Sequence, residues 1–128
     1  EPFYCAVGYK SNQTVLQYNE NDFGMGMGLL KQGGDMEQPI TVKTIDEIFS
    51  NKKITYIKMD IEGEEKAALD GAMYVIRHNK PKLMISGYHK IEDLWEIPET
   101  IWKINEDYKI YVGHAPEVSM EKEFYCTL

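Results

Sequence analysis

The chain has 128 residues, of which 43% are hydrophobic and 12% aromatic, which suffices for one modest core and leaves little room for a second. Its formal net charge of -7 argues against a nucleic-acid partner, because binding to a phosphate backbone needs clustered Lys and Arg. No apolar stretch could span a bilayer and no signal segment opens the chain, so we expect a cytoplasmic protein with no membrane partner.

The front of the chain predicts two strands and a long loop. Residues 3–9 and 14–19 are strand-like runs joined by the polar turn 10–13, and we expect them to form an antiparallel hairpin. Residues 19–39 contain five glycines and a proline without a sustained period. This composition predicts a long flexible loop.

Residues 40–49 predict a short strand followed by a short helix. The strand covers 40–44 and the helix covers 45–49. Thr44 and Glu47 are spaced as a capping box, in which the threonine side chain accepts a hydrogen bond from the backbone N–H three residues later. The helix is therefore expected to begin directly after Thr44.

A strand at 54–60 precedes a helix with a clear apolar period. Its apolar residues at offsets 0, 3, 4 and 7 are Leu69, Ala72, Met73 and Ile76. Residues at this spacing lie on one face of a helix. We therefore expect this stripe to face the core.

The second half of the chain continues the alternation of strands and helices. A strand at 82–88 is followed by a helical segment, in which we expect Pro98 to restart the helix at its first turn. Two further strands are predicted at 108–114 and 123–128. Strands that alternate with helices indicate an α/β fold in which helices cover the faces of a sheet.

Three acids surround one glycine where the strand 54–60 ends. In α/β sheets, ligands bind outside the carboxyl ends of the parallel strands, so Asp60 is expected to face a crevice. Glu62 follows, and Gly63 permits close backbone approach or a positive φ before the helix that contains Glu65. The alternative is that Glu62, Glu64 and Glu65 cap a helix N-terminus, which we accept for Glu64. It explains Asp60 less well, because Asp60 lies at the strand end.

The same acids carry a resemblance to a known family. The run at 58–65 and its continuation resemble the signature of the FkbM-type methyltransferases, in which a strand ends in Lys-x-Asp-x-Glu-Gly-x-Glu and a helix follows with Leu-x-Gly-Ala. The matching residues are Lys58, Asp60, Glu62, Gly63, Glu65, Leu69, Gly71 and Ala72. With its flanking segments, the resemblance covers roughly residues 40–112.

The resemblance implies a Rossmann-like class I fold and an S-adenosylmethionine-dependent methyl transfer to a hydroxyl of a small molecule or sugar. It implies Asp60 for cofactor binding and Asp60, Glu62 and His89 as catalytic candidates, since the acceptor must be aligned and its proton removed. Glu65, Tyr88 and His89 are the candidate substrate-binding residues. Paired acids also permit a divalent metal, but no third ligand is evident in the sequence, so no metal is predicted.

Two elements of such an enzyme are missing from the matched region: a glycine-rich loop after the first strand and an acid that ends the second. Residues 22–28 spell Asp-x-Gly-x-Gly-x-Gly, but neither an apolar strand nor a sustained helix adjoins them. We therefore expect an incomplete sheet. Residues 1–128 are interpreted as a single domain, the carboxyl-terminal part of a methyltransferase domain that is inactive alone.

Two other functions stay open at this point. One is a non-catalytic binding or assembly module of the same fold, and the other is a metal-dependent hydrolase that uses Asp60, Glu62 and His89. Loss of neighbouring strands would also leave an edge of strand 54–60 unpaired. A second copy could cover that edge, or exchange the front hairpin through the loop 19–39, to give a homodimer.

Overall fold

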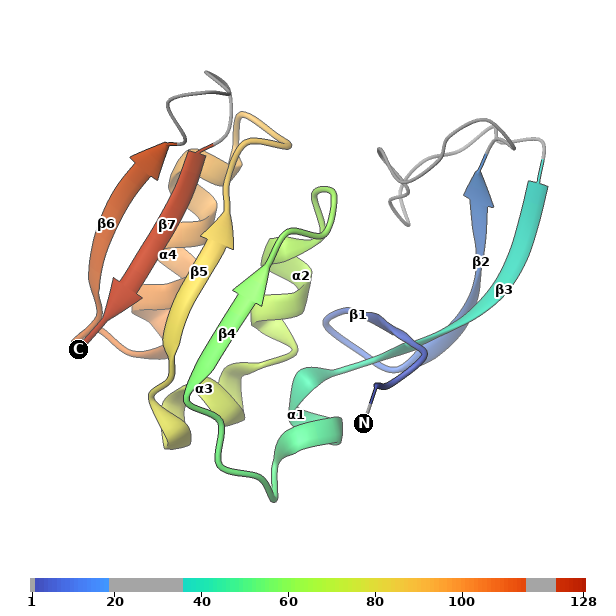
Figure 1. Cartoon of the computed structure of the whole chain (residues 1–128), viewed down its shortest axis with the longest axis horizontal. Coiled ribbons are helices and arrows are strands. Elements are labelled where there is room, and N and C mark those ends of the chain that lie inside the picture. Colours follow the sequence, from blue (N-terminus) through green and yellow to red (C-terminus); the bar gives the residue numbers. More distant parts are fainter. Residues whose placement is uncertain (1, 19–35, 115–121) are drawn as a thin grey trace.

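The computed structural model describes residues 2–18, 36–114 and 122–128, which form two β-sheets and four helices (Figure 1). The first sheet has the order β1-β3-β2 and the second has the order β4-β5-β7-β6. The strands are β1 (Ala6–Val7), β2 (Asn12–Tyr18), β3 (Met36–Lys43), β4 (Tyr56–Met59), β5 (Lys82–Ser86), β6 (Lys109–His114) and β7 (Lys122–Thr127). The helices are α1 (Ile45–Phe49), α2 (Glu65–Asp70), α3 (Met73–Asn79) and α4 (Asp93–Ile104).

The first sheet is built around β3 and differs from the prediction. β1 pairs with β3 in parallel, and β2 pairs with β3 antiparallel from Asn12 opposite Val42 to Tyr18 opposite Met36. The predicted hairpin of residues 3–9 with residues 14–19 is therefore wrong, because β1 and β2 both use β3 as their partner.

The start of β3 explains this error. The strand begins at Met36, inside the segment 19–39 that was predicted as a loop, and continues through Pro39. β1 covers only the end of β3 opposite Val42 and Lys43, so Pro39 lies where no ladder hydrogen bond is needed on that side. Residues 19–35, which include the motif 22–28, lie outside the described residues.

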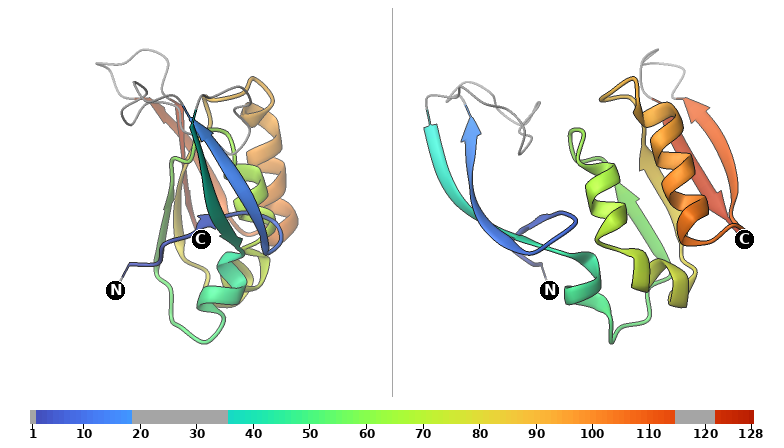
Figure 2. Two further views of the ribbon diagram at one scale, coloured as in Figure 1. Left: turned by 90° about the vertical axis from the view of Figure 1, so that its right-hand side faces the viewer. Right: turned by 180° about the vertical axis from the view of Figure 1, so that it is seen from behind.

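The second sheet holds the core. β4 and β5 are parallel neighbours, and β7 runs antiparallel between β5 and β6. The helices α2, α3 and α4 all cover one face of this sheet, rather than both faces (Figure 2). The buried apolar residues of this core are Ile45, Met59, Ala68, Leu69, Ala72, Val75, Ile76, Leu83, Ile85, Ile97, Ile101, Ile104, Tyr108, Phe124 and Cys126.

Burial raises the pKa of two polar groups of this core. Burial raises the pKa of Cys126 to about 12, and it is the main cause that raises the pKa of Tyr108 to about 12. The Tyr108 hydroxyl donates a hydrogen bond to the carbonyl of Pro81 at 2.6 Å. Both side chains, uncharged at neutral pH in any case, therefore stay uncharged well into the alkaline range.

The predicted helix after β4 is two helices, with a break between α2 and α3. A Cβ on Gly71 would lie 2.1 Å from the carbonyl oxygen of Gly8, so the chain after β1 approaches the break too closely for any other residue. Leu69 and Ile76 are fully buried, as predicted, but the break turns Met73 outward to 38% exposed.

The amino end of α3 is capped from another helix. The carboxylate of Asp46, in α1, accepts hydrogen bonds from the backbone N–H groups of Tyr74 at 2.9 Å and Val75 at 2.8 Å. The N–H of Asp46 in turn donates to the carbonyl of Gly71 at 2.9 Å. This contact ties the first sheet and α1 to the helices of the second sheet.

The caps of the other helices agree in part with the sequence. Thr44 caps α1 by accepting from the backbone N–H of Glu47 at 3.0 Å, which confirms the predicted helix start. Pro98 lies inside α4, which runs without interruption from Asp93, so the predicted restart at Pro98 is wrong. Pro98 is the sixth residue of α4, and because it has no N–H, the helix lacks one backbone hydrogen bond there but continues.

The outer edge of β4 is open. In the part of the chain that the structure describes, β4 pairs with β5 alone, and the β2–β3 hairpin does not cover its other side. The homodimer through this edge stays a prediction. Across the same residues, the structure contains no helix with the length and apolar character needed to cross a membrane.

We predict that Leu69→Ala lowers the free energy of unfolding by about 2 to 5 kcal/mol, because the side chain is fully buried and its loss leaves a cavity. Urea unfolding followed by circular dichroism measures the loss. Met73→Ala is the control, and we expect it to cost less than about 1 kcal/mol because Met73 is partly exposed. Equal losses in the two variants would show that the packing of α2 and α3 is misread.

Candidate active site

The turn between β4 and α2 has an unusual backbone. Glu62 has φ +58 and Gly63 has φ +95, so two consecutive residues adopt left-handed conformations. Glycine adopts this conformation freely, whereas for Glu62 it costs roughly 1 to 2 kcal/mol. Strained backbone of this kind concentrates at functional sites, where the surrounding structure holds it in place.

The turn between β5 and α4 supports the first turn. The ammonium of Lys90 donates a hydrogen bond to the carbonyl oxygen of Gly63. The backbone N–H of Lys90 donates to the Asp93 carboxylate at 2.9 Å, which fixes Lys90 at the start of α4. Neither Lys90 nor Asp93 is among the sequence-predicted site residues, although an acid three residues after a turn is a recognisable capping signal.

His89 lies at the centre of the site. Its Nε2 is 3.7 Å from Asp60 Oδ1 and 3.7 Å from Glu62 Oε2, and its Nδ1 is 3.3 Å from Glu65 Oε1. The imidazole side chain is 10% exposed. The adjacent carboxyl ends of the parallel strands β4 and β5 thus surround one imidazole with three carboxylates.

Glu65 is the deepest of the three acids. Its side chain is fully buried, and Oε1 accepts a hydrogen bond from the backbone N–H of Ile61 at 2.8 Å. It lies on the same face of α2 as Ala68 and Leu69, three and four residues later, which is the sequence signal for its inward direction. Its predicted contact with a substrate stays a prediction, and its observed neighbour is His89.

Asp60 and Glu62 are the acids that meet solvent, with side chains that are each 39% exposed. The hydroxyl of Tyr88 donates a hydrogen bond to Asp60 Oδ1 at 3.1 Å. The Tyr88 ring also packs on the His89 ring, with centroids 4.2 Å apart. All five sequence-predicted site residues therefore lie together in the structure.

A cavity of about 400 Å³ adjoins this cluster. It is lined by Gly87, Tyr88, Lys90, Ile91, Leu94 and Lys122. Tyr88 lines the cavity and also donates the hydrogen bond to Asp60, so this tyrosine connects the cavity with the carboxylates. Ile91 and Leu94 give it an apolar side.

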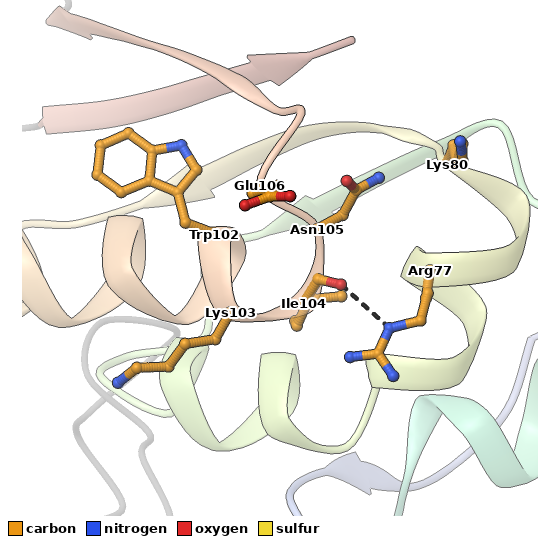
Figure 3. Close-up of a pocket in the computed structure, with 7 residues that line it drawn as sticks. All are labelled: Arg77, Lys80, Trp102, Lys103, Ile104, Asn105 and Glu106. Carbon is orange, nitrogen blue, oxygen red and sulfur yellow. Dashed lines mark hydrogen bonds between the residues drawn. The ribbon is translucent and has the colours of Figure 1, made fainter.

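A second cavity, of about 440 Å³, lies at the opposite end of the strands, where α3 and α4 end (Figure 3). Figure 3 shows the guanidinium of Arg77 directed at the carbonyl of Ile104, to which its Nε donates at 3.1 Å. Lys80 and Lys103 lie on opposite sides of the view. Cations at helix carboxyl ends satisfy terminal carbonyls, so this cavity is explained by helix capping.

Three residues of the cluster have the spacing of a metal site. One donor atom each from Asp60, Glu65 and His89 lies within 4.8 Å of the other two. The sequence showed no third ligand, because Glu65 sits in the helix after the turn and only the fold directs it toward His89. The predicted cofactor contact of Asp60 is untested, and the glycine motif 22–28 lies outside the described residues.

Comparisons with known proteins agree with the resemblance found in the sequence. Residues 7–110 match the methyltransferase FkbM domain family. The crystal structure of methyltransferase FkbM from Methylobacillus flagellatus KT is similar to this chain, with 32% sequence identity and a TM-score of 0.72. The match covers 95% of this chain and 27% of that one, so this chain spans about a quarter of its length. No curated protein matches the chain.

We predict that Glu62→Gly leaves the free energy of unfolding unchanged or raises it by up to about 1 kcal/mol, because glycine relieves the positive φ. Lys80→Gly is the matched control, since Lys80 also has a positive φ, of +51, and lies away from the site at the end of α3. Urea unfolding of both variants checks the prediction. A loss above about 1 kcal/mol in Glu62→Gly alone would mean that the carboxylate stabilises the fold more than its backbone conformation costs.

Proposed function

The chain belongs to the FkbM methyltransferase family, and from this premise we propose that it takes part in S-adenosylmethionine-dependent methyl transfer to a hydroxyl of a small molecule or sugar. The observation that supports this reaction best is the position of His89 among three carboxylates at the carboxyl ends of two parallel strands. Such a cluster can receive the proton that a hydroxyl loses when it is methylated.

The exposed acids are the groups that an acceptor would meet first. Asp60 and Glu62 are accessible, whereas both ring nitrogens of His89 are buried behind them. We assign Asp60 to the acceptor hydroxyl, because Tyr88 already orients its Oδ1 by a hydrogen bond. The proton then passes to the Asp60 carboxylate, and the His89 imidazole lies 3.7 Å from it, near enough to interact with its charge.

His89 is positioned from behind by Glu65. The buried carboxylate faces Nδ1 at 3.3 Å, while the N–H of Ile61 holds its Oε1 in place. This arrangement directs Nε2 toward Asp60 and Glu62. An acid that orients the far nitrogen of an imidazole is the arrangement that supports general-base catalysis.

The chemistry of the methyl donor suits a binding site that contains an exposed carboxylate. S-adenosylmethionine supplies an activated methyl group on a positively charged sulfur. Asp60 is the residue of this chain that would hold it, because a carboxylate favours a nearby cation and accepts hydrogen bonds from ribose hydroxyls. The acceptor would occupy the cavity beside Tyr88, whose apolar residues Ile91 and Leu94 suit the carbon face of a sugar or a similar molecule.

The methyl-transfer reaction is proposed for a protein of which residues 1–128 form a part, rather than for these residues alone. We infer that a Rossmann-like class I sheet continues beyond the open edge of β4, and that residues 1–128 alone do not turn over. The alternative, a non-catalytic module of the same fold, predicts that the carboxylates can be neutralised without consequence for any methyl transfer.

We expect the 128-residue chain by itself to show no micromolar binding of S-adenosylhomocysteine in isothermal titration calorimetry. The reason is that the described residues hold no glycine-rich turn between an apolar strand and a helix, which is how this class cradles its cofactor. Micromolar binding would contradict this and would assign the cradle to the motif 22–28.

In a methyl-transferring protein that contains this chain, we expect Asp60→Asn to lower kcat by about 10²- to 10⁴-fold with little change in unfolding, because the amide cannot take the hydroxyl's proton. Transfer from a radiolabelled donor measures kcat. Asp70→Asn is the matched control: it makes the same charge change on α2, where Asp70 forms a surface ion pair with Lys66 at 3.2 Å. An unchanged kcat in Asp60→Asn, or an equal loss in both variants, would refute the role of Asp60.

A further inference from the structure

We propose that Asp60, Glu65 and His89 bind one divalent transition-metal ion, of the Mn²⁺ or Zn²⁺ kind. The three donor atoms come from the end of β4, the start of α2 and the turn after β5, and all lie within 4.8 Å of one another. Metal ligands at about 2.0 to 2.2 Å from an ion lie roughly 3 Å apart. The exposed side chain of Asp60 can close this difference by a small rotation.

The polar atoms of this cluster lack partners. Among the described residues, neither ring nitrogen of His89 has a hydrogen-bond partner, and the same holds for Oε2 of Glu65. All three atoms are buried, and buried polar atoms in folded proteins nearly always have a partner. Both His89 nitrogens face carboxylate oxygens, and a cation bound to one nitrogen together with Asp60 and Glu65 would give that nitrogen and the two acids a partner.

The charges of the cluster also favour a cation. Asp60, Glu62 and Glu65 place three carboxylates around one imidazole. The ammonium of Lys90 is bonded to the Gly63 carbonyl, and that of Lys66 is paired with Asp70. A single proton on His89 offsets one of the three negative charges, whereas a divalent ion offsets two.

The donor set selects the class of ion. One imidazole nitrogen with carboxylate oxygens suits Mn²⁺, Fe²⁺ or Zn²⁺, whereas Mg²⁺ and Ca²⁺ prefer oxygen ligands alone. Glu62 Oε2, at 3.7 Å from His89 Nε2, is a further oxygen beside the site. Because the positive φ of Glu62 directs the turn back toward His89, the strained backbone serves the same cluster.

A metal here would also bear on the proposed reaction. An ion held by Asp60 and His89 would lie where the acceptor hydroxyl is placed and would lower the pKa of that hydroxyl. This consequence rests on the proposed function. The binding of the ion does not, because it depends only on the three ligands.

The test is a titration of MnCl₂ or ZnCl₂ into the chelator-treated 128-residue chain, with no methyl donor or acceptor present. Calorimetry measures the heat of binding, and electron paramagnetic resonance measures free Mn²⁺. We expect saturable binding of one ion per chain, with Mn²⁺ and Zn²⁺ bound more tightly than Mg²⁺. Absence of saturable binding by either ion would overturn the proposal.

The variants distinguish ion binding at these three ligands from nonspecific attraction of the cation to an acidic protein. His89→Gln and Asp60→Asn should each weaken Mn²⁺ binding about tenfold or more. Glu99→Gln makes the same charge change as Asp60→Asn on the exposed surface of α4 and should leave the affinity unchanged. Wild-type affinity in both ligand variants, or an equal loss in Glu99→Gln, would refute the site.

Circular dichroism checks that each variant is folded before it is titrated. Asp60→Asn carries the test even where His89→Gln does not fold, because Asp60 is partly exposed and Asn keeps its size. A metal-dependent rise in the wild-type Tm that is absent in Asp60→Asn is the second expected result, and an equal rise in both would count against the site. Failure of ion binding leaves the methyl-transfer proposal intact, and failure of methyl transfer leaves the ion site intact.

Discussion

The parallel pairing of β4 with β5 is the contact on which the site depends. Its register sets Met59 opposite Ile85, so the two strands end at the same level and their following turns meet. Asp60 leaves one strand there, and His89 lies three residues beyond the end of the other. A shift of this register by one residue would send the alternate side chains to the wrong face and separate the imidazole from the carboxylates.

The residues at this edge of the sheet have features that usually lower the stability of a fold. Glu62 adopts a left-handed backbone, Glu65 is a fully buried acid, and His89 is nearly buried without a hydrogen-bond partner in the described structure. The surrounding turns compensate: Lys90 holds the Gly63 carbonyl, and the N–H of Ile61 holds Glu65. Local strain and buried charge that the rest of the fold must support are typical of residues kept for chemistry.

The first sheet and the helices of the second sheet are joined by a close backbone approach, a side-chain cap and the apolar packing of Val7 and Ile45 with the core. Gly71 and Gly8 meet at a separation that no side chain permits, and Asp46 spans from α1 to the amino end of α3. This joint breaks the helix after β4 into α2 and α3. Glu65 begins α2, at the end of this helix that lies away from the break.

The sequence by itself determined the alternation of strands and helices, the family signature at residues 58–72, and the five residues that the site contains, because hydrophobic period and local spacing are properties of neighbouring residues. It did not determine the partner of β1 and β2, the helix break at Gly71, or the continuation of α4 through Pro98. Each of these depends on residues distant in the chain: β3 for the first pair, Gly8 for the break, and the packing of α4 on the sheet for the proline. The closeness of Glu65 to His89 could not be read from the sequence for the same reason, because only the pairing of β4 with β5 brings the imidazole to this carboxylate.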